Sequence, residues 1–500
     1  MSLDELSPPP VDGRIDKLSL ILGLIAIAIS AASALAIGRF GALVLLVVPA
    51  VIFLLVVFIQ PDYGLMIFVF ITVTQVSNVA INFYNAPSIA QPLAGLLMAV
   101  ILLRIVIYRE LPLNWGRIVP ILVIYVVALF ISMFNADDFE MSSMAFIGFI
   151  KDALGGVIVI LLIQRPASFR KAIWTLVIAG MFMGSISMFQ TVTRTYDNNY
   201  FGFGRWESQT AGQDSRNRLT GPYDNPNAYS QVIVVIFILA LERLWHEKRT
   251  LLRLVAGWSV IVCGLTVVFT YSRGGVMTLL AATGVLFLQN KPRILPVLLT
   301  VVAGLAVVQF LPSDYTSYIS TVRDLIPTQT NDQINDPSFR GRLSENLVAL
   351  RMFSDDPLFG VGLGNYQTQY QNYSRQIGLD NRRVTRNPSS LYLEVLSEQG
   401  LIGSTAFLLL LYTVFSGLII SRRKFLLAGL NDHSNLTMAM LAGLAGYLIA
   451  AVVKNSAYSN VYWILVGIAL SAVQASMFSL REKNELAGFS RSYGRKQSTG

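Results

Sequence analysis

Residues 251–275 read LLRLVAGWSVIVCGLTVVFTYSRGG, a largely apolar block that ends in a short polar turn. A helix needs about 20 mostly apolar residues to cross a bilayer, and residues 251–271 supply that length. Because lipid offers the backbone no hydrogen-bond partners, we predict a helix here rather than a strand. The following Ser272-Arg273-Gly274-Gly275 turn is then expected at a membrane surface, with the two glycines making a tight reversal into the next helix.

The same apolar pattern recurs along the whole chain. Of its 500 residues 54% are hydrophobic and 13% are charged, and the mean hydropathy is +0.58. A soluble domain carries about 25% charged residues, so a soluble enzyme is excluded. We predict an all-α polytopic membrane protein with about 12–14 transmembrane helices and one large external loop. The candidate spans are 18–38, 41–60, 63–82, 88–108, 118–134, 145–163, 173–190, 227–242, 251–271, 275–289, 294–311, 400–420, 436–454 and 460–480.

The short basic loops predict the orientation, because cytoplasmic loops carry an excess of Lys and Arg. With the N-terminus inside, the short loops near 109–117, 165–171, 243–253, 291–293 and 422–424 all fall on the cytoplasmic side. The predicted organisation is a cytoplasmic segment 1–17, a helix array 18–311 with an external loop 191–226, a large external loop 312–399 with short helices, C-terminal helices 400–480 and a basic cytoplasmic tail 481–500. The tail is interpreted as a membrane-surface anchor, and no nucleic-acid partner is expected.

The two long outer loops use arginine in place of lysine. The 312–399 loop has eight arginines and no lysine, and the 191–226 loop has arginines at 194, 205, 216 and 218. A guanidinium presents a rigid fork that binds phosphate oxygens in pairs and stays charged. This bias favours a phosphate or diphosphate ligand; pairing of the arginines with loop acids is the alternative interpretation.

Four outer stretches carry local signals. The first, Arg218–Asn227, contains Gly-Pro and Asn-Pro-Asn turns, and Asn225 or Asn227 is expected to cap the next helix. The second is the Ser272–Gly275 turn, and the third is the glycine-rich segment 355–366, which has neither the strand nor the lysine of a nucleotide-binding loop.

The fourth stretch is Arg386–Gly400. Asn387 is expected to cap a helix that starts with Pro388. Ser389 and Ser390 would then lie in the first turn, where the helix dipole attracts anions. Gly400 is expected to separate this helix from the next transmembrane span.

These stretches, in this order before the last helices, resemble the bacterial O-antigen ligase and O-antigen polymerase superfamily. The resemblance covers about residues 190–420 and includes Arg340-Gly341-Arg342, while the first third matches only as a helix array. Members are inverting glycosyltransferases of the GT-C type. The resemblance implies transfer of a glycan from a polyprenyl diphosphate carrier to an acceptor hydroxyl at the outer face of the bacterial inner membrane, with the bilayer and a glycan or lipid-linked acceptor as partners.

The resemblance also implies roles for individual residues. Arg273 and Arg342 fall on the positions thought to hold the diphosphate, and the remaining expected substrate contacts are Arg218, Arg340, Arg386, Ser389, Ser390 and Asn227. The family's histidine-asparagine pair falls on Ser389 and Ser390, so its histidine is missing. This departure favours a divergent polymerase or ligase.

Without that histidine, a carboxylate is the local candidate for a general base. Glu394 is the first candidate and Glu398 the second, unless the departing diphosphate takes the proton. His246 and His433 lie on the predicted cytoplasmic side and cannot replace the histidine. No metal and no cofactor are expected.

Two other functional classes are weighed. A secondary transporter of a small anion is one, but such proteins usually place ionisable groups or broken helices near the membrane midplane, often in repeated halves. A non-catalytic membrane scaffold is the other, and it has no need of an outer loop rich in arginine.

Overall fold

The computed structural model describes residues 56–108, 115–211, 214–290, 337–378, 386–452, 454 and 459–497. The chain divides into two compact units, 1–64 and 65–500. The second unit contains every residue of the predicted site. The predicted spans 18–38 and 294–311, and most of 41–60, lie outside the described residues.

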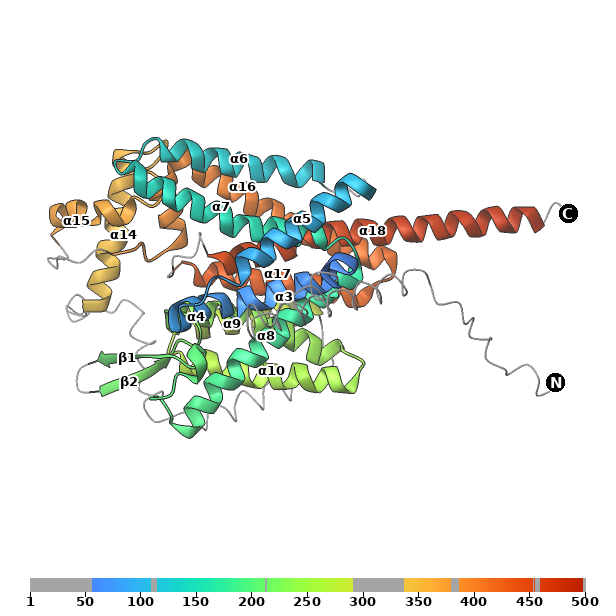
Figure 1. Ribbon diagram of the computed structural model, residues 1–500, viewed down its shortest axis with the longest axis horizontal. Coiled ribbons are helices and arrows are strands. Elements are labelled where there is room, and N and C mark those ends of the chain that lie inside the picture. The colour runs from blue at the N-terminus through green and yellow to red at the C-terminus, as the bar shows by residue number, and fades with distance from the viewer. Residues whose placement is uncertain are drawn as a thin grey trace, which may run out of the picture. The chain divides into compact units, whose positions relative to one another are not determined.

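Helices dominate the described parts of the chain (Figure 1). They are α3 (Pro61–Val73), α4 (Val76–Tyr84), α5 (Ala90–Tyr108), α6 (Trp115–Met133), α7 (Phe139–Leu162), α8 (Pro166–Thr193), α9 (Pro226–His246), α10 (Thr250–Phe269), α11 (Arg273–Asn290), α14 (Pro337–Asp355), α15 (Tyr366–Ile377), α16 (Leu391–Ala428), α17 (Asn431–Ala450) and α18 (Asn460–Gln497). The 191–226 loop also forms a hairpin that the sequence did not predict, in which β1 (Trp206–Ala211) pairs antiparallel with β2 (Asp214–Leu219).

Within the described residues, 7 helices are long and apolar enough to cross a membrane, or up to 8 if the bent pair α3–α4 forms one span. The predicted all-α polytopic membrane protein is confirmed at this level. The structure describes only part of the 12–14 expected spans. α17, which begins with the polar residues Asn431, Asp432 and His433, is not among the seven.

The prediction of one continuous helix over 63–82 is wrong. α3 ends at Val73, α4 begins at Val76, and the two helices meet at 55°. The break falls where side chains compete with the backbone: Thr74 Oγ1 donates to the carbonyl of Phe70 at 2.6 Å, and Gln75 has the left-handed φ of 58°. The amide of Gln75 also donates to Thr72 and to Asn460 of α18, so a tertiary contact holds the bend.

α9 forms the centre of one helix group. It packs against α8, α10, α11 and α17, and 83% of its span is buried, against 22% for α5. A helix that is apolar on all sides is expected to be surrounded in this way. Small residues let its neighbours approach closely: a Cβ on Gly180 of α8 would lie 2.2 Å from the side chain of Ile236. Such small-residue contacts are typical of membrane helix packing.

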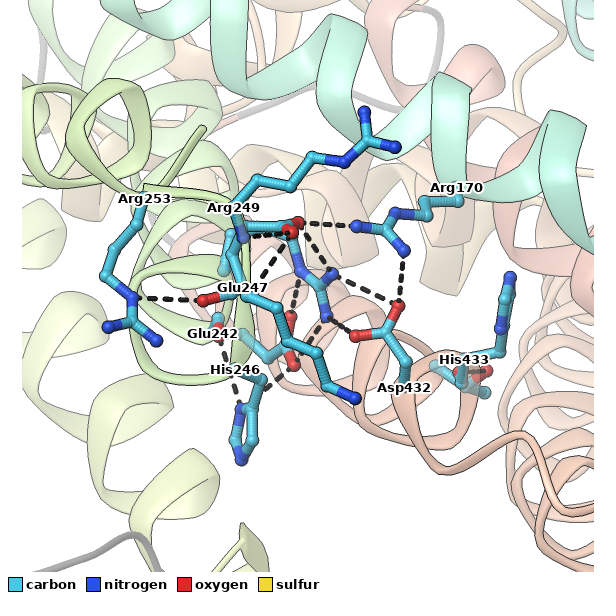
Figure 2. A network of polar contacts seen from close by, with 11 residues as sticks. Arg170, Glu242, His246, Glu247, Arg249, Arg253, Asp432 and His433 are labelled. Carbon is cyan, nitrogen blue, oxygen red and sulfur yellow. Dashed lines mark hydrogen bonds and ion pairs between the residues drawn. The ribbon is translucent and has the colours of Figure 1, made fainter. Parts of the chain in front are cut away.

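A group of charged residues joins α8, α9 and α17 at one end of these helices (Figure 2). Arg243 is fully buried, and its guanidinium donates to Glu242 at 2.6 Å and to Asp432 at 2.9 Å. Arg170 reaches Glu247 at 2.5 Å and Asp432 at 3.2 Å. We call Arg170, Glu242, Arg243, His246, Glu247 and Asp432 the charge cluster.

Two contacts show that α9 and α17 run antiparallel. Arg243 meets Asp432 at one end, and Gln231 donates to the carbonyl of Tyr447 at the other. The amide of Leu391 donates to the carbonyl of Ala451, so the fourth stretch lies at the end opposite the charge cluster. Figure 1 shows α14, α15 and the β1–β2 hairpin at that same end. The predicted cytoplasmic and external groups thus lie at opposite ends, while the direction of insertion stays a prediction.

Candidate functional site

The Arg218–Asn227 stretch and the turn before α11 are held together by Arg218. Its Nε donates to the carbonyl of Thr270 at 3.0 Å, and its Nη2 donates to Asn227 Oδ1 at 3.2 Å. Asn225 caps α9, since its side chain accepts the backbone N–H of Asn227 at 2.8 Å. The expected helix cap is confirmed at Asn225, and Asn227 turns its side chain to Arg218 instead.

The reversal between α10 and α11 does not use the two glycines, so that expectation is wrong. Tyr271 makes the turn with a φ of 49°, and Ser272 then caps α11 by accepting the N–H of Gly275 at 3.1 Å. Gly275 is needed for a different reason: a Cβ there would lie 2.7 Å from Oγ of Ser230 on α9. The glycine therefore lets α11 pack closely against α9.

This geometry places Arg273 at the first residue of α11, where its side chain is exposed. A cation at a helix N-terminus is unfavourable by itself, because the backbone N–H groups there already carry partial positive charge. The same combination is favourable for a bound anion, which the N–H groups and the guanidinium attract together. The turn can therefore hold a phosphate group.

The third and fourth stretches pair through their backbones. The amides of Val361 and Gly362 donate to Ser397 and Glu398, and the amide of Leu401 donates to Pro357. The glycines allow the two backbones to approach closely. This packing accounts for the glycine-rich segment, and no nucleotide-binding role is needed to explain it. Gly360 and Gly400 both have positive φ, of 71° and 62°.

Gly400 is expected to tolerate no side chain. Its φ of 62° and ψ of −160° belong to a region that is essentially restricted to glycine. A Cβ there would also lie 2.5 Å from the carbonyl carbon of Leu358. We expect Gly400→Ala to lower the free energy of unfolding by about 3 kcal/mol, measured by thermal unfolding in detergent. Gly284→Ala, where nothing lies within 4 Å of the added Cβ, is the control. Equal melting temperatures for the two variants would contradict this account of the break.

The start of the fourth stretch differs from the prediction. The helix begins at Leu391, with Ser390 at the cap position, rather than after a cap at Asn387. Residues around the helix start make hydrogen bonds to other elements instead. Ser389 Oγ donates to Asn346 Oδ1 of α14 at 2.7 Å, and the N–H of Leu391 donates to the carbonyl of Ala451. The expected break at Gly400 is confirmed.

α14 carries the second part of the candidate site. Arg386 Nη1 donates to Glu345 Oε1 at 3.0 Å, which is the acid pairing expected as the alternative for the loop arginines. Arg205 with Asp224 and Arg351 with Asp355 are paired in the same way. Arg342 is exposed on α14, three residues before Glu345. The side chain of Arg340 lies outside the description.

The two candidate bases are both buried on the fourth stretch: Glu394 is 6% exposed and Glu398 is 3% exposed. The structure adds Lys454, which the sequence analysis missed. Burial lowers the pKa of Lys454, and the charges of Glu394 and Glu345 oppose that effect. The only signal in the sequence was a lysine at the outer end of the predicted span 436–454, where basic residues are less common.

The pKa of Glu345 is raised, because burial outweighs the opposing effects of Arg386, Arg342 and Ser389. A carboxyl with a raised pKa in the folded state favours folding most at low pH, and its contribution falls as the pH rises through that pKa. We expect Glu345→Gln to remove this decline, because the glutamine amide does not titrate. Melting temperatures measured at pH values from the ordinary pKa of a glutamate up to neutral pH test this prediction. If the melting temperatures of wild type and variant change with pH in the same way, the prediction is contradicted.

Several predicted residues lie in two groups at the same end of the helices. Arg218 and Asn227 lie in the first group, where Arg218 binds the carbonyl of Thr270 in the turn before Arg273. Arg386, Ser389 and Glu394 lie in the second group on the fourth stretch, where Arg386 binds Glu345 of α14. Together with the apolar helices, this indicates a multi-pass membrane protein with a polar, arginine-bearing candidate site at one end.

The comparison with known families agrees with this class. Residues 258–408 match the model of the family described as O-antigen ligase, which confirms the resemblance to the O-antigen ligase and polymerase superfamily. The matched range includes Arg273, Arg342, Arg386 and Glu394 but not Arg218 or Asn227. A search of curated proteins finds no match to the chain. The match supports a glycosyltransferase of the O-antigen ligase or polymerase type.

Proposed function

We propose that this protein is an inverting glycosyltransferase that moves a glycan from a polyprenyl diphosphate carrier to an acceptor hydroxyl at the outer face of the cytoplasmic membrane. It acts as a surface polysaccharide polymerase or an O-antigen-type ligase. The observation that carries the proposal is Arg273, exposed at the N-terminus of α11 within the range that matches the family.

In this proposal the arginines stabilise the leaving diphosphate. The acceptor oxygen attacks the anomeric carbon as the bond from that carbon to the phosphate oxygen breaks, and negative charge grows on the diphosphate. Preorganised cations at the point where charge develops are usually the largest catalytic contribution. Arg273 and Arg342 take this role.

The remaining predicted residues support that step. Arg218 and Asn227 hold the turn before Arg273, while Arg386 and Ser389 join the fourth stretch to α14. Arg340 and Ser390 are proposed as further substrate contacts. Glu394 takes the proton of the acceptor hydroxyl.

Purified protein in proteoliposomes, supplied with a polyprenyl diphosphate-linked glycan, tests the proposal. The expected product is a longer glycan, or a glycan attached to an acceptor lipid, with release of polyprenyl diphosphate. Donor that stays intact in the presence of cell-derived acceptor lipids would contradict the proposal.

A second candidate function is transport of a small anion, and the break between α3 and α4 favours it, because broken helices often mark transport sites. The same proteoliposomes loaded with a concentration gradient of phosphate or bicarbonate distinguish the two functions. Anion flux without glycan transfer would select the transporter.

A further inference from the structure

A small polar pocket of about 60 Å³ lies beside the break between α3 and α4. One wall comes from α4 and the other from the segment that leads into α9. The lining residues include Gln75, Asn78, Asn82 and Phe83 on one side and Arg205, Tyr223 and Asp224 on the other. Since residues 222–224 belong to the Arg218–Asn227 stretch, the pocket opens at the same end of the helices as the candidate site.

Arg205 is fixed in the pocket wall by several contacts. Its Nε donates to the carbonyl of Gly221 at 3.1 Å, its Nη1 to Asp224 at 2.8 Å, and its Nη2 to the carbonyl of Pro222. The guanidinium also lies 5.6 Å from the centre of the Phe83 ring. Because Asp224 neutralises it, this arginine presents an oriented polar wall and adds no net positive charge.

The opposite wall carries three carboxamides. Gln75, Asn78 and Asn82 have the spacing of one helix face, and the amide of Asn78 donates to Gln75 Oε1. Asn78 and Asn82 are exposed, on a helix whose other residues are mostly apolar. The bend at Gln75 turns this amide face toward Arg205 and Asp224.

These groups match a neutral, polyhydroxylated ligand. A carboxamide both donates and accepts hydrogen bonds, and so does each hydroxyl of a sugar. The carboxylate of Asp224 accepts further hydroxyl protons, and Phe83 and Tyr223 offer apolar surface to the C–H faces of a ring. An anion would instead need an uncompensated cation, which Arg205 does not provide.

We propose that this pocket binds a sugar residue of the glycan. The proposal rests on the proposed function, since it assigns to that reaction a subsite that recognises the sugar separately from the diphosphate. The sugar belongs either to the donor glycan or to the acceptor glycan, and both present the same hydroxyl chemistry.

A binding experiment without diphosphate tests the pocket alone. The probe is the glycan that mild acid releases from the polyprenyl diphosphate carriers of the producing cells. We expect it to bind the purified protein and to bind about tenfold more weakly to Asn78→Ala/Asn82→Ala, which lacks two hydrogen-bonding amides. Asn82→Ala alone, at an exposed position, is expected to weaken binding about threefold.

The control is Asn372→Ala, which removes an exposed amide on α15 away from the pocket and should leave the affinity unchanged. Failure of the released glycan to bind wild-type protein, or equal affinity of the pocket variants and wild type, overturns the proposal. Arg273→Ala should still bind the released glycan. If Arg273→Ala transfers glycan normally while the pocket variants lose binding, the proposed catalytic role of Arg273 is refuted and the sugar-binding role of the pocket is supported.

Transfer kinetics then identify the source of the sugar. A raised KM for the acceptor at an unchanged KM for the donor assigns the pocket to the acceptor glycan, and the reverse assigns it to the donor. If the KM for the donor and the KM for the acceptor are both unchanged in Asn78→Ala/Asn82→Ala, the pocket is not a subsite for either glycan.

Discussion

Replacing Arg243 with methionine is expected to lower the free energy of unfolding by about 3–5 kcal/mol, the cost of removing one partner from a buried ion pair. The guanidinium is fully buried and contacts Glu242 and Asp432, with Glu247 3.6 Å away. Its loss leaves Glu242, which is also fully buried, without its main compensating charge. Thermal unfolding of detergent-purified protein and the yield of monodisperse protein measure the effect.

Arg249→Met is the matched control. Arg249 lies six residues further along the chain and is exposed, and Figure 2 shows its side chain beside the charge cluster. An exposed charge contributes little to stability, so its removal is expected to change the free energy of unfolding by less than about 0.5 kcal/mol. Similar melting temperatures for Arg243→Met and Arg249→Met would show that the charge cluster does not hold the helices together.

The charge cluster also shows what a linear reading of the sequence leaves out. Arg243 was counted among the basic residues that orient the short loops, which is a property of sequence position. The structure shows instead that it lies in the last turn of α9 and binds Asp432, 189 residues away. Loop statistics carry no information about such a partner, because the pairing depends on how α9 and α17 pack.

The features that were predicted correctly depend on local chemistry. Apolar length predicted most of the long helices, Asn225 was one of the two expected caps of α9, and Gly400 predicted a break. Each follows from backbone hydrogen bonding or from the conformational freedom of glycine.

The features that were missed depend on tertiary contacts. Gln75 interrupts a helix that hydropathy favours, and its side chain donates to Asn460. Ser389 pairs with Asn346, and α16 begins later than the cap signals in the sequence suggested. Lys454 was missed because its significance comes from Glu394 and Glu345, which lie on other elements.

The largest effect on activity is expected from Arg273. Arg273→Ala should lower the rate of glycan transfer about 100-fold to 1000-fold, the usual cost of removing one preorganised contact to developing charge. The loss should appear mainly in kcat, because the charge on the diphosphate grows only as the bond to the sugar breaks. Arg342→Ala is expected to behave in the same way. Single-turnover transfer in proteoliposomes measures both.

Two comparisons separate catalysis from structure. Arg351→Ala, on α14 like Arg342 but paired with Asp355, is expected to keep nearly wild-type transfer. Arg273→Lys should recover only part of the rate, since an ammonium cannot offer the paired donors of a guanidinium. Because Arg273 is exposed, its loss should leave the melting temperature almost unchanged. A well-folded Arg273→Ala protein with full transfer activity would remove Arg273 from the diphosphate site, and with it the reason for arginine at the first residue of α11.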